Sequence, residues 1–207
     1  MPTTRTITVY QLEELDDTAK DRAYQHWLDW YPYLMAPENQ DTLTAFCELF
    51  PVKIDHWEYD AYTYSIHCTV LSDYPHEAVP DLRGWRLATY IWNNYGDRLY
   101  TGKYYFTHRW GANGEYTAKS RRSKVIMEHS CVLTGYCRDE DILEPVYAFL
   151  QHPDGTTLSE LMQQCCIAWV KACSDDCAAS TSKAAFAEFC DDNGITFDAT
   201  GRVVEDQ

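Results

Sequence analysis

Nine cysteines and seven histidines are the side chains of this sequence that could bind a metal ion. Zinc sites use thiolates and imidazoles at short, regular spacing, of which the C-x-x-C pair is the usual sign. The sequence contains no such pair. Cys166, Cys173 and Cys177 follow one another at the spacing of one helix face, where cysteine usually packs in the core. We therefore predict buried, reduced cysteines, with no metal and no other cofactor.

Signatures of catalysis are also missing. The sequence has no G-x-S-x-G, H-E-x-x-H, G-x-x-x-x-G-K-[ST] or G-x-G-x-x-G motif. Pairs such as Asp139/Asp141 and Asp55/Glu58 have the chemistry to hold Mg²⁺, but 32 acidic residues in a chain of 207 produce such pairs by chance. We predict that the chain is not an enzyme. A metal-dependent hydrolase that uses scattered Asp, His and Cys side chains is the alternative.

Acidic residues dominate the charge. The 32 acidic residues stand against 17 basic ones, and residues 125–207 alone carry 15 acidic and 4 basic side chains. A net charge of −15 opposes general binding to nucleic acid or anionic lipid. Solubility is one explanation; the other is a surface that imitates the phosphates of a duplex and binds a basic partner. The predicted partner-binding surface consists of Asp139, Glu140, Asp141, Glu144, Asp175, Asp176, Asp191 and Asp192.

One basic patch interrupts this pattern, directly after the turn signal Asn113-Gly114. It is predicted either as the soluble flank of a hairpin or as a second contact patch. Tyrosine and tryptophan are plentiful, at 16 and 7 residues. On an acidic chain, these aromatic residues favour a protein interface over stacking on single-stranded nucleic acid. The patch consists of Lys119, Arg121, Arg122 and Lys124.

The elements that must position these residues follow from the spacing of apolar side chains. A period of 3.6 predicts helices over residues 17–30, 43–50, 157–177 and 182–192, and a further helix from residue 82 that closes over 93–96 at a terminal glycine. Alternation predicts short strands over 6–10 and 195–198, a hairpin over 53–59 and 62–70, and more strands between 99 and 137. No linker divides the chain. We expect a single α+β domain over residues 1–207, with a central antiparallel sheet flanked by N-terminal and C-terminal helices.

The first residues, MPTTRTITVY, contain no apolar stretch of the kind that directs export. The longest uncharged apolar run is shorter than the ~18 residues that a membrane span needs. We expect a cytoplasmic protein with reduced thiols and no membrane contact.

Three segments resemble a family of small phage and prophage proteins. VYQLEELDDTAKDRA at residues 9–23 is similar to the family's opening strand and helix, and VKID at 52–55 to its "G-I-x-I-D" strand. EFCDDNGITFDATGR at 188–202 is similar to its terminal helix, strand and turn. The aromatic segment 59–64 departs from the family, whose turn is rich in Ser, Gly, Gln and Asp. Some members are labelled antitoxins, and small acidic phage proteins of this kind include CRISPR inhibitors. The resemblance implies phage origin and supplies no catalytic residues.

Charge, missing motifs and resemblance together lead to one expectation. The chain is a phage-encoded acidic inhibitor that acts in the bacterial cytoplasm. Its partner is a bacterial nucleic-acid-processing defence protein, with a CRISPR effector nuclease as the first candidate, and it blocks access of nucleic acid without binding nucleic acid itself. An antitoxin-like regulatory protein that neutralises a toxin is the alternative, and a homodimer remains open in either case.

Overall fold

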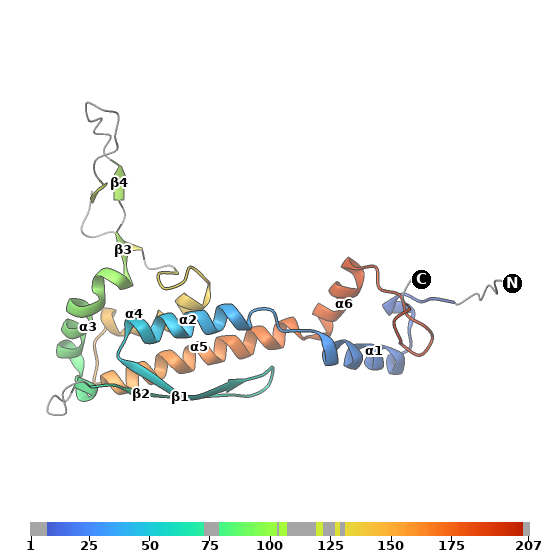
Figure 1. The fold of residues 1–207 in the computed structure, drawn as a ribbon, viewed down its shortest axis with the longest axis horizontal. Helices are drawn as coiled ribbons and strands as arrows, with labels where there is room; N and C mark the ends of the chain where they lie inside the picture. Colours follow the sequence, from blue (N-terminus) through green and yellow to red (C-terminus); the bar gives the residue numbers. More distant parts are fainter. Residues whose placement is uncertain are drawn as a thin grey trace. The chain divides into compact units, whose positions relative to one another are not determined.

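Helices lie toward both ends of the described chain, and a β-hairpin separates them in sequence (Figure 1). The computed structural model describes residues 8–72, 79–102, 104–106, 119–121, 127–128 and 131–204, and from 101 to 130 it describes the backbone of four short strands alone. The helices are α1 Asp17–Trp30, α2 Ala36–Leu49, α3 Gly84–Leu99, α4 Arg138–Gln151, α5 Leu158–Ser180 and α6 Lys183–Asp192. The strands are β1 Val52–Tyr59, β2 Tyr64–Val70, β3 Thr101–Gly102, β4 Tyr104–Phe106, β5 Lys119–Arg121 and β6 Met127–Glu128. Single 3₁₀ turns span Leu12–Glu14 and Val79–Asp81.

The chain divides into two compact units. Unit 1 combines residues 1–35, 60–63 and 174–207, and unit 2 combines 36–59 and 64–173. Each unit has a hydrophobic core of its own. Helix α5 belongs to unit 2 up to residue 173 and to unit 1 from residue 174, and its core residues all lie in unit 2. The single domain predicted for residues 1–207 stays a prediction, which one cooperative unfolding transition would support.

Unit 1 is built from the two ends of the chain. Asp16 caps α1 by accepting a hydrogen bond from the Ala19 backbone N–H at 2.8 Å. The buried stripe of α1 ends at Trp27, whose ring contacts the ring of Phe186 on α6 at 5.2 Å between centroids. Phe197 completes this core, and its backbone pairs with that of Tyr10. The spacing of apolar side chains along α1 and α6 therefore determines which face of each helix packs against the other.

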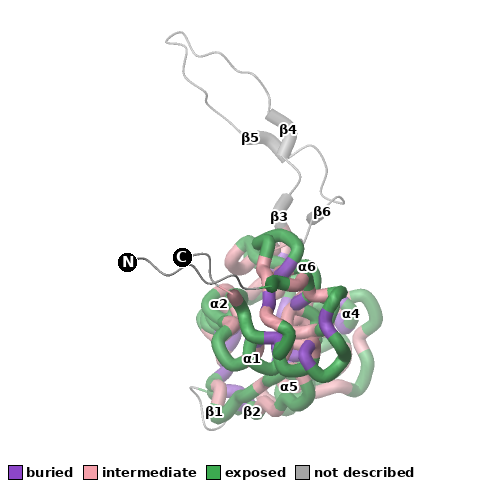
Figure 2. The backbone as a smooth tube through the Cα atoms, turned by 90° about the vertical axis from the view of Figure 1, so that its right-hand side faces the viewer, coloured by how far each residue is buried: buried purple, intermediate pink, exposed green. Residues whose placement is uncertain are grey.

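Unit 2 has α5 in its core, with buried side chains from Leu158 to Cys173. Figure 2 colours the backbone of the described residues by burial. The Trp169 indole donates a hydrogen bond to the Asn39 carbonyl of α2 at 3.1 Å. On its other side α5 meets the β1–β2 hairpin, where Trp57 packs edge-on against Trp169. Gln163 fastens the same hairpin, because its side chain accepts from the Cys68 N–H and donates to the Ile66 carbonyl. The buried side chains of α2, α4 and α5 complete this core.

The predicted α+β class, with antiparallel strands and flanking helices, is confirmed. The predicted helices at 17–30, 157–177 and 182–192 correspond to α1, α5 and α6. No separate helix was predicted for the segment of α4, which contains Pro145 inside the helix. The predicted helix that closes over residues 93–96 at a terminal glycine corresponds to α3, but Gly96 does not end it, since the helix continues through the buried Gly96 to Leu99. The hairpin turn spans residues 60–63, and Asn113-Gly114 lies outside the described residues.

Candidate partner-binding surfaces

Asp139 was predicted to lie on an acidic surface, and this was wrong because its side chain is 0% exposed. One carboxylate oxygen accepts from three consecutive backbone N–H groups, those of Leu133, Thr134 and Gly135, at 2.7–2.9 Å. The other oxygen accepts from the Thr134 hydroxyl at 2.7 Å and the Thr42 hydroxyl at 3.3 Å. A buried carboxylate needs such donors. Asp139 therefore folds the loop before α4 and ties it to α2.

Two further acidic residues of α4, Glu140 and Asp141, lie where a carboxylate stabilises the helix. Glu140 and Asp141 occupy the first turn, where the helix dipole favours negative charge. Asp141 forms an ion pair with Arg138 at 2.5 Å. Glu144 is exposed one turn further on. Glu140, Asp141 and Glu144 belong to unit 2, whereas the remaining predicted acidic residues belong to unit 1.

Near the end of α5, two acidic neighbours differ in their surroundings. Asp175 is exposed, and Asp176 is half-buried. The Asp176 carboxylate accepts a hydrogen bond from the Tyr33 hydroxyl at 2.6 Å, so it connects α5 to the segment after α1. Asp176 thus has a structural role, and Asp175 is the residue of this pair that lies on the surface.

Helix α6 carries acidic residues where they cost stability. Asp191 and Asp192 are exposed in its last turn, where the negative end of the helix dipole disfavours carboxylates. Glu188, also exposed, precedes them by three and four positions, a spacing at which like charges repel. We call these three residues the α6 acidic cluster. The stability of the fold gives no reason for acidic residues at these three positions. Glu188 was not among the predicted site residues, although its spacing of three and four positions from Asp191 and Asp192 could have indicated it.

Unit 1 as a whole concentrates negative charge. It makes up about a third of the chain, yet it contains 15 acidic and 5 basic residues, a formal charge of −10 out of the total of −15. Along the sequence, most of the excess of acidic over basic residues lies in residues 125–207. Folding adds the acidic N-terminal residues to it, because α1 and α6 pack together.

An exposed tryptophan lies beside the α6 acidic cluster. Trp30 is 52% exposed, and its ring meets that of Phe189 edge-on at 5.8 Å. Phe189 directly follows Glu188 in the chain. Tryptophan beside charged groups is frequent at the centre of protein interfaces. Unit 1 thus combines an exposed aromatic residue, Trp30, with the helix that carries the α6 acidic cluster.

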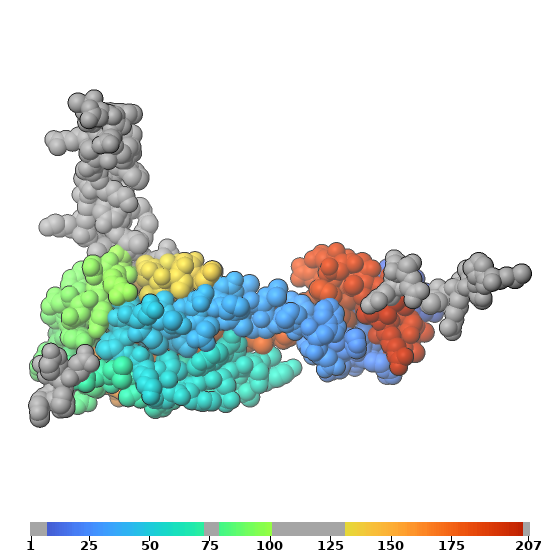
Figure 3. All heavy atoms as spheres, viewed as in Figure 1, coloured from blue at the N-terminus to red at the C-terminus, as the bar shows by residue number. Residues whose placement is uncertain are grey.

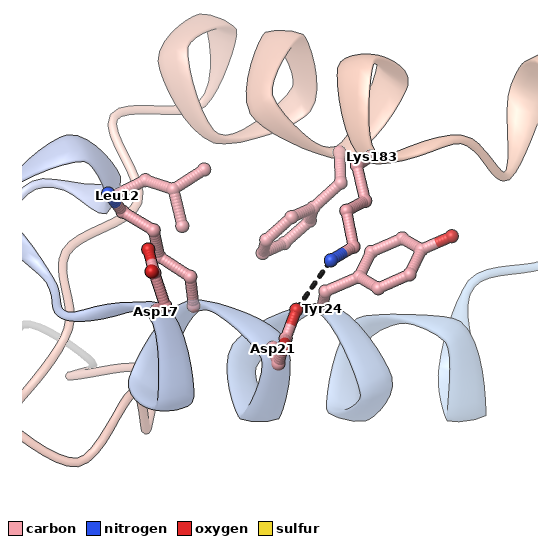
Figure 4. A pocket seen from close by; sticks show the side chains of 7 residues that line it. Leu12, Asp17, Asp21, Tyr24 and Lys183 are labelled. Carbon is pink, nitrogen blue, oxygen red and sulfur yellow. Dashed lines mark hydrogen bonds and ion pairs between the residues drawn. The ribbon is translucent and has the colours of Figure 1, made fainter.

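A pocket of 390 Å³ opens between the start of α1 and the start of α6, lined by Leu12, Asp17, Lys20, Asp21, Tyr24, Lys183 and Phe186. Figure 4 shows Lys183 reaching toward Asp21 and the Tyr24 ring; its ammonium lies 2.5 Å from the Asp21 carboxylate and 5.7 Å from the ring centre. The hydrogen bond that Lys183 donates to Asp21 raises the pKa of Lys183, and burial raises the pKa of the Tyr24 phenol. Both groups therefore keep their protons near neutral pH.

The outer face of the β1–β2 hairpin holds Asp55 and Glu58, which were considered as a magnesium pair. Asp55 accepts from the Thr69 hydroxyl at 2.6 Å and lies 3.1 Å from His67 Nδ1. These hydrogen bonds lower the pKa of Asp55. Glu58 instead accepts from Ser65 at 3.1 Å. The two carboxylates thus have separate partners, and in the part of the chain that the structure describes no group of three or more His, Cys, Asp or Glu side chains is arranged to hold a metal ion.

The predicted basic patch is described in part. Lys119 and Arg121 lie on β5, whose backbone pairs with β4. Arg122 and Lys124 lie outside the described residues. The proposed contact role of this patch therefore stays a prediction.

Cysteine reactivity gives a direct test of the core. All nine cysteines are free, and Cys137 is the exposed one. Burial raises the pKa of Cys47 and of Cys190 to about 11, so few thiolates form there at neutral pH. With a chromogenic disulfide reagent we expect one fast thiol in the native protein and nine after denaturation. Several fast thiols in the native protein would contradict this packing.

No helix in the described part of the chain is both long and apolar enough to cross a membrane. Comparison with protein-family models, with curated protein sequences and with solved structures found no significant match to this chain.

Proposed function

We propose that this chain is a phage-encoded inhibitor whose unit 1 binds the basic nucleic-acid channel of a bacterial defence nuclease, with a CRISPR effector as the first candidate. The observation that carries the proposal is the α6 acidic cluster: three exposed carboxylates kept at a helix end that they destabilise. Residues that oppose folding are expected at functional sites. A basic partner would relieve their mutual repulsion.

The charge of unit 1 supports the same partner class. A surface with a net charge of −10 attracts a cationic groove over several ångströms and accelerates association. Trp30, which packs beside Phe189, adds an exposed apolar surface that a partner can bury, in addition to the attraction between charges. Asp175, Glu188, Asp191 and Asp192 replace the α4 residues as the proposed contact residues. The mechanism is exclusion of nucleic acid and requires no catalytic group.

The decisive variant is Asp191→Lys with Asp192→Lys. Lysine in the last turn of α6 favours the helix dipole, so we expect the free energy of unfolding to rise by about 0.5–1 kcal/mol. Binding to the nuclease should nevertheless weaken at least tenfold, mainly through slower association, and become less sensitive to salt. Binding kinetics on immobilised guide-loaded nuclease and a thermal melt measure both effects. Weaker binding with higher stability cannot be due to misfolding.

The matched control is Asp41→Lys with Glu48→Lys on α2, which makes the same change in net charge on exposed residues of unit 2. We expect it to retain most of the affinity. Equal losses in both variants would show that total charge, not the α6 acidic cluster, is responsible. Failure to bind or inhibit any of a panel of CRISPR nucleases at low salt would overturn the proposed partner.

The antitoxin-like alternative rests on the same acidic surface and differs in the partner. Co-expression separates the two: rescue of growth from a toxin encoded beside the gene, without any effect on CRISPR interference, would favour the antitoxin.

A further inference from the structure

Positive charge is concentrated in one segment of this acidic chain. Residues 83–124 contain nine lysines and arginines and two acidic residues, a net charge of +7, while the rest of the chain carries −22. The same segment holds ten of the 30 aromatic residues. Cations interleaved with aromatic rings are the composition of surfaces that bind single-stranded nucleic acid. The total charge of −15 conceals this segment.

Helix α3 begins the segment, and its outward face is aromatic. Trp85 is 74% exposed and Trp92 is 49% exposed. They are seven residues apart, two turns along one helix face, or about 10 Å. Arg86 is exposed directly after Trp85. Figure 3 shows the light green atoms of α3 open to solvent on unit 2.

The ring of Trp92 is held in place from behind. A Cβ on the buried Gly96 would lie 3.3 Å from the Trp92 ring, so the absence of a side chain lets the indole settle on the helix. Tyr100 packs against Trp92 at 5.7 Å between ring centres, and against Tyr147 at 5.4 Å. The Tyr147 hydroxyl in turn donates to the Leu99 carbonyl at 2.8 Å. A ring supported in this way loses little conformational entropy when a base stacks on it.

The backbone beyond α3 continues the alternation of aromatic and basic residues. In the β4–β5 ladder, Tyr104 is the register partner of Arg121, and Phe106 is the partner of Lys119. Each of these two ladder positions therefore joins an aromatic residue to a basic one.

From these observations we infer that the outward face of α3, with Trp85, Trp92 and Arg86, binds single-stranded nucleic acid. The two indoles stack on bases, and the guanidinium contacts a phosphate. The inference departs from the expectation that the chain makes no direct contact with nucleic acid. It is independent of the proposed function, because it concerns unit 2 and needs no nuclease.

The test is fluorescence anisotropy with labelled oligothymidylate and oligouridylate of about 20 nucleotides, at about 50 mM salt. We expect Trp85→Ala with Trp92→Ala to weaken binding at least tenfold, since each stacked base contributes appreciably. Arg86→Glu should weaken binding. It should also make the slope of log binding constant against log salt concentration less steep by about 0.7, which is the value for one phosphate contact on a single strand. A duplex of the same length should bind less tightly.

Trp30→Ala is the matched control, because this tryptophan is similarly exposed, at 52%, but lies in unit 1. It should leave oligonucleotide binding unchanged, and near-UV circular dichroism should show that all variants fold. Absence of binding at low salt, or binding that the α3 variants leave unchanged, would overturn the inference. So would equally tight binding of polyglutamate, which would reassign the surface to an acidic protein.

Discussion

Replacing Asp139 by alanine is expected to lower the free energy of unfolding by about 4 kcal/mol, near the upper end for single substitutions. The substitution removes an acceptor from three backbone N–H groups and two hydroxyls at once. Each buried donor left without a partner costs about 1–3 kcal/mol. The loop before α4 and the contact between α4 and α2 should loosen together. Chemical denaturation followed by intrinsic fluorescence measures the loss.

Asp141→Ala is the control for this prediction. It removes the same chemical group from the same helix, but Asp141 is half-buried and makes an ion pair with Arg138. Surface pairs of this kind contribute about 0–1 kcal/mol. If the two variants lost similar stability, the carboxylate of Asp139 would not organise the loop.

Gly201→Ala is the second large effect that we expect, in unit 1. Gly201 has φ +81°, and a Cβ at this position would overlap the backbone carbonyl of Ala19 on α1. Backbone atoms at both sides of this contact must move, so the turn that begins at Asp198 should separate from α1. We expect a loss of about 3 kcal/mol or more, because strain in the left-handed region adds to the steric clash.

Two other glycines separate these causes. Gly194 also has a positive φ, +60°, but has open space around its Cβ position, so Gly194→Ala should cost about 1 kcal/mol through backbone strain alone. Gly155 has open space and no positive φ, and Gly155→Ala should be neutral. Thermal melts of the three variants should rank in that order. A Gly201→Ala variant as stable as Gly155→Ala would contradict the close packing against α1.

Local patterns in the sequence were sufficient for elements with regular apolar spacing. Ala19, Ala23 and Trp27 predict α1, and the structure buries all three. In α4 the pattern was hidden, because Pro145 removes a backbone donor and favours a break. Burial of Ile142, Val146 and Phe149 nevertheless makes the helix favourable. Tertiary packing thus outweighed local propensity.

The candidate site shows why residue type alone was insufficient. Asp139 and Asp191 have the same side chain and both lie in acidic runs, yet one is buried among backbone donors and the other is exposed at a helix end. The difference is that folding brings backbone N–H groups to the carboxylate of Asp139 and leaves that of Asp191 exposed to solvent. The concentration of charge in unit 1 likewise depends on pairing segments some 160 positions apart, such as Asp21 and Lys183. No local pattern reports such a pairing.

The construction of unit 1 from both ends of the chain has a consequence for synthesis on the ribosome. Helix α1 leaves the ribosome early, but Phe186 and Phe197, which cover its buried stripe, are translated more than 150 residues later. Until then Trp27 and its neighbours lack their partners, since domains form as their segments become available. The acidic surface therefore arises only on chains translated through α6 and the following turn. A fragment that ends before α6 would therefore lack this surface.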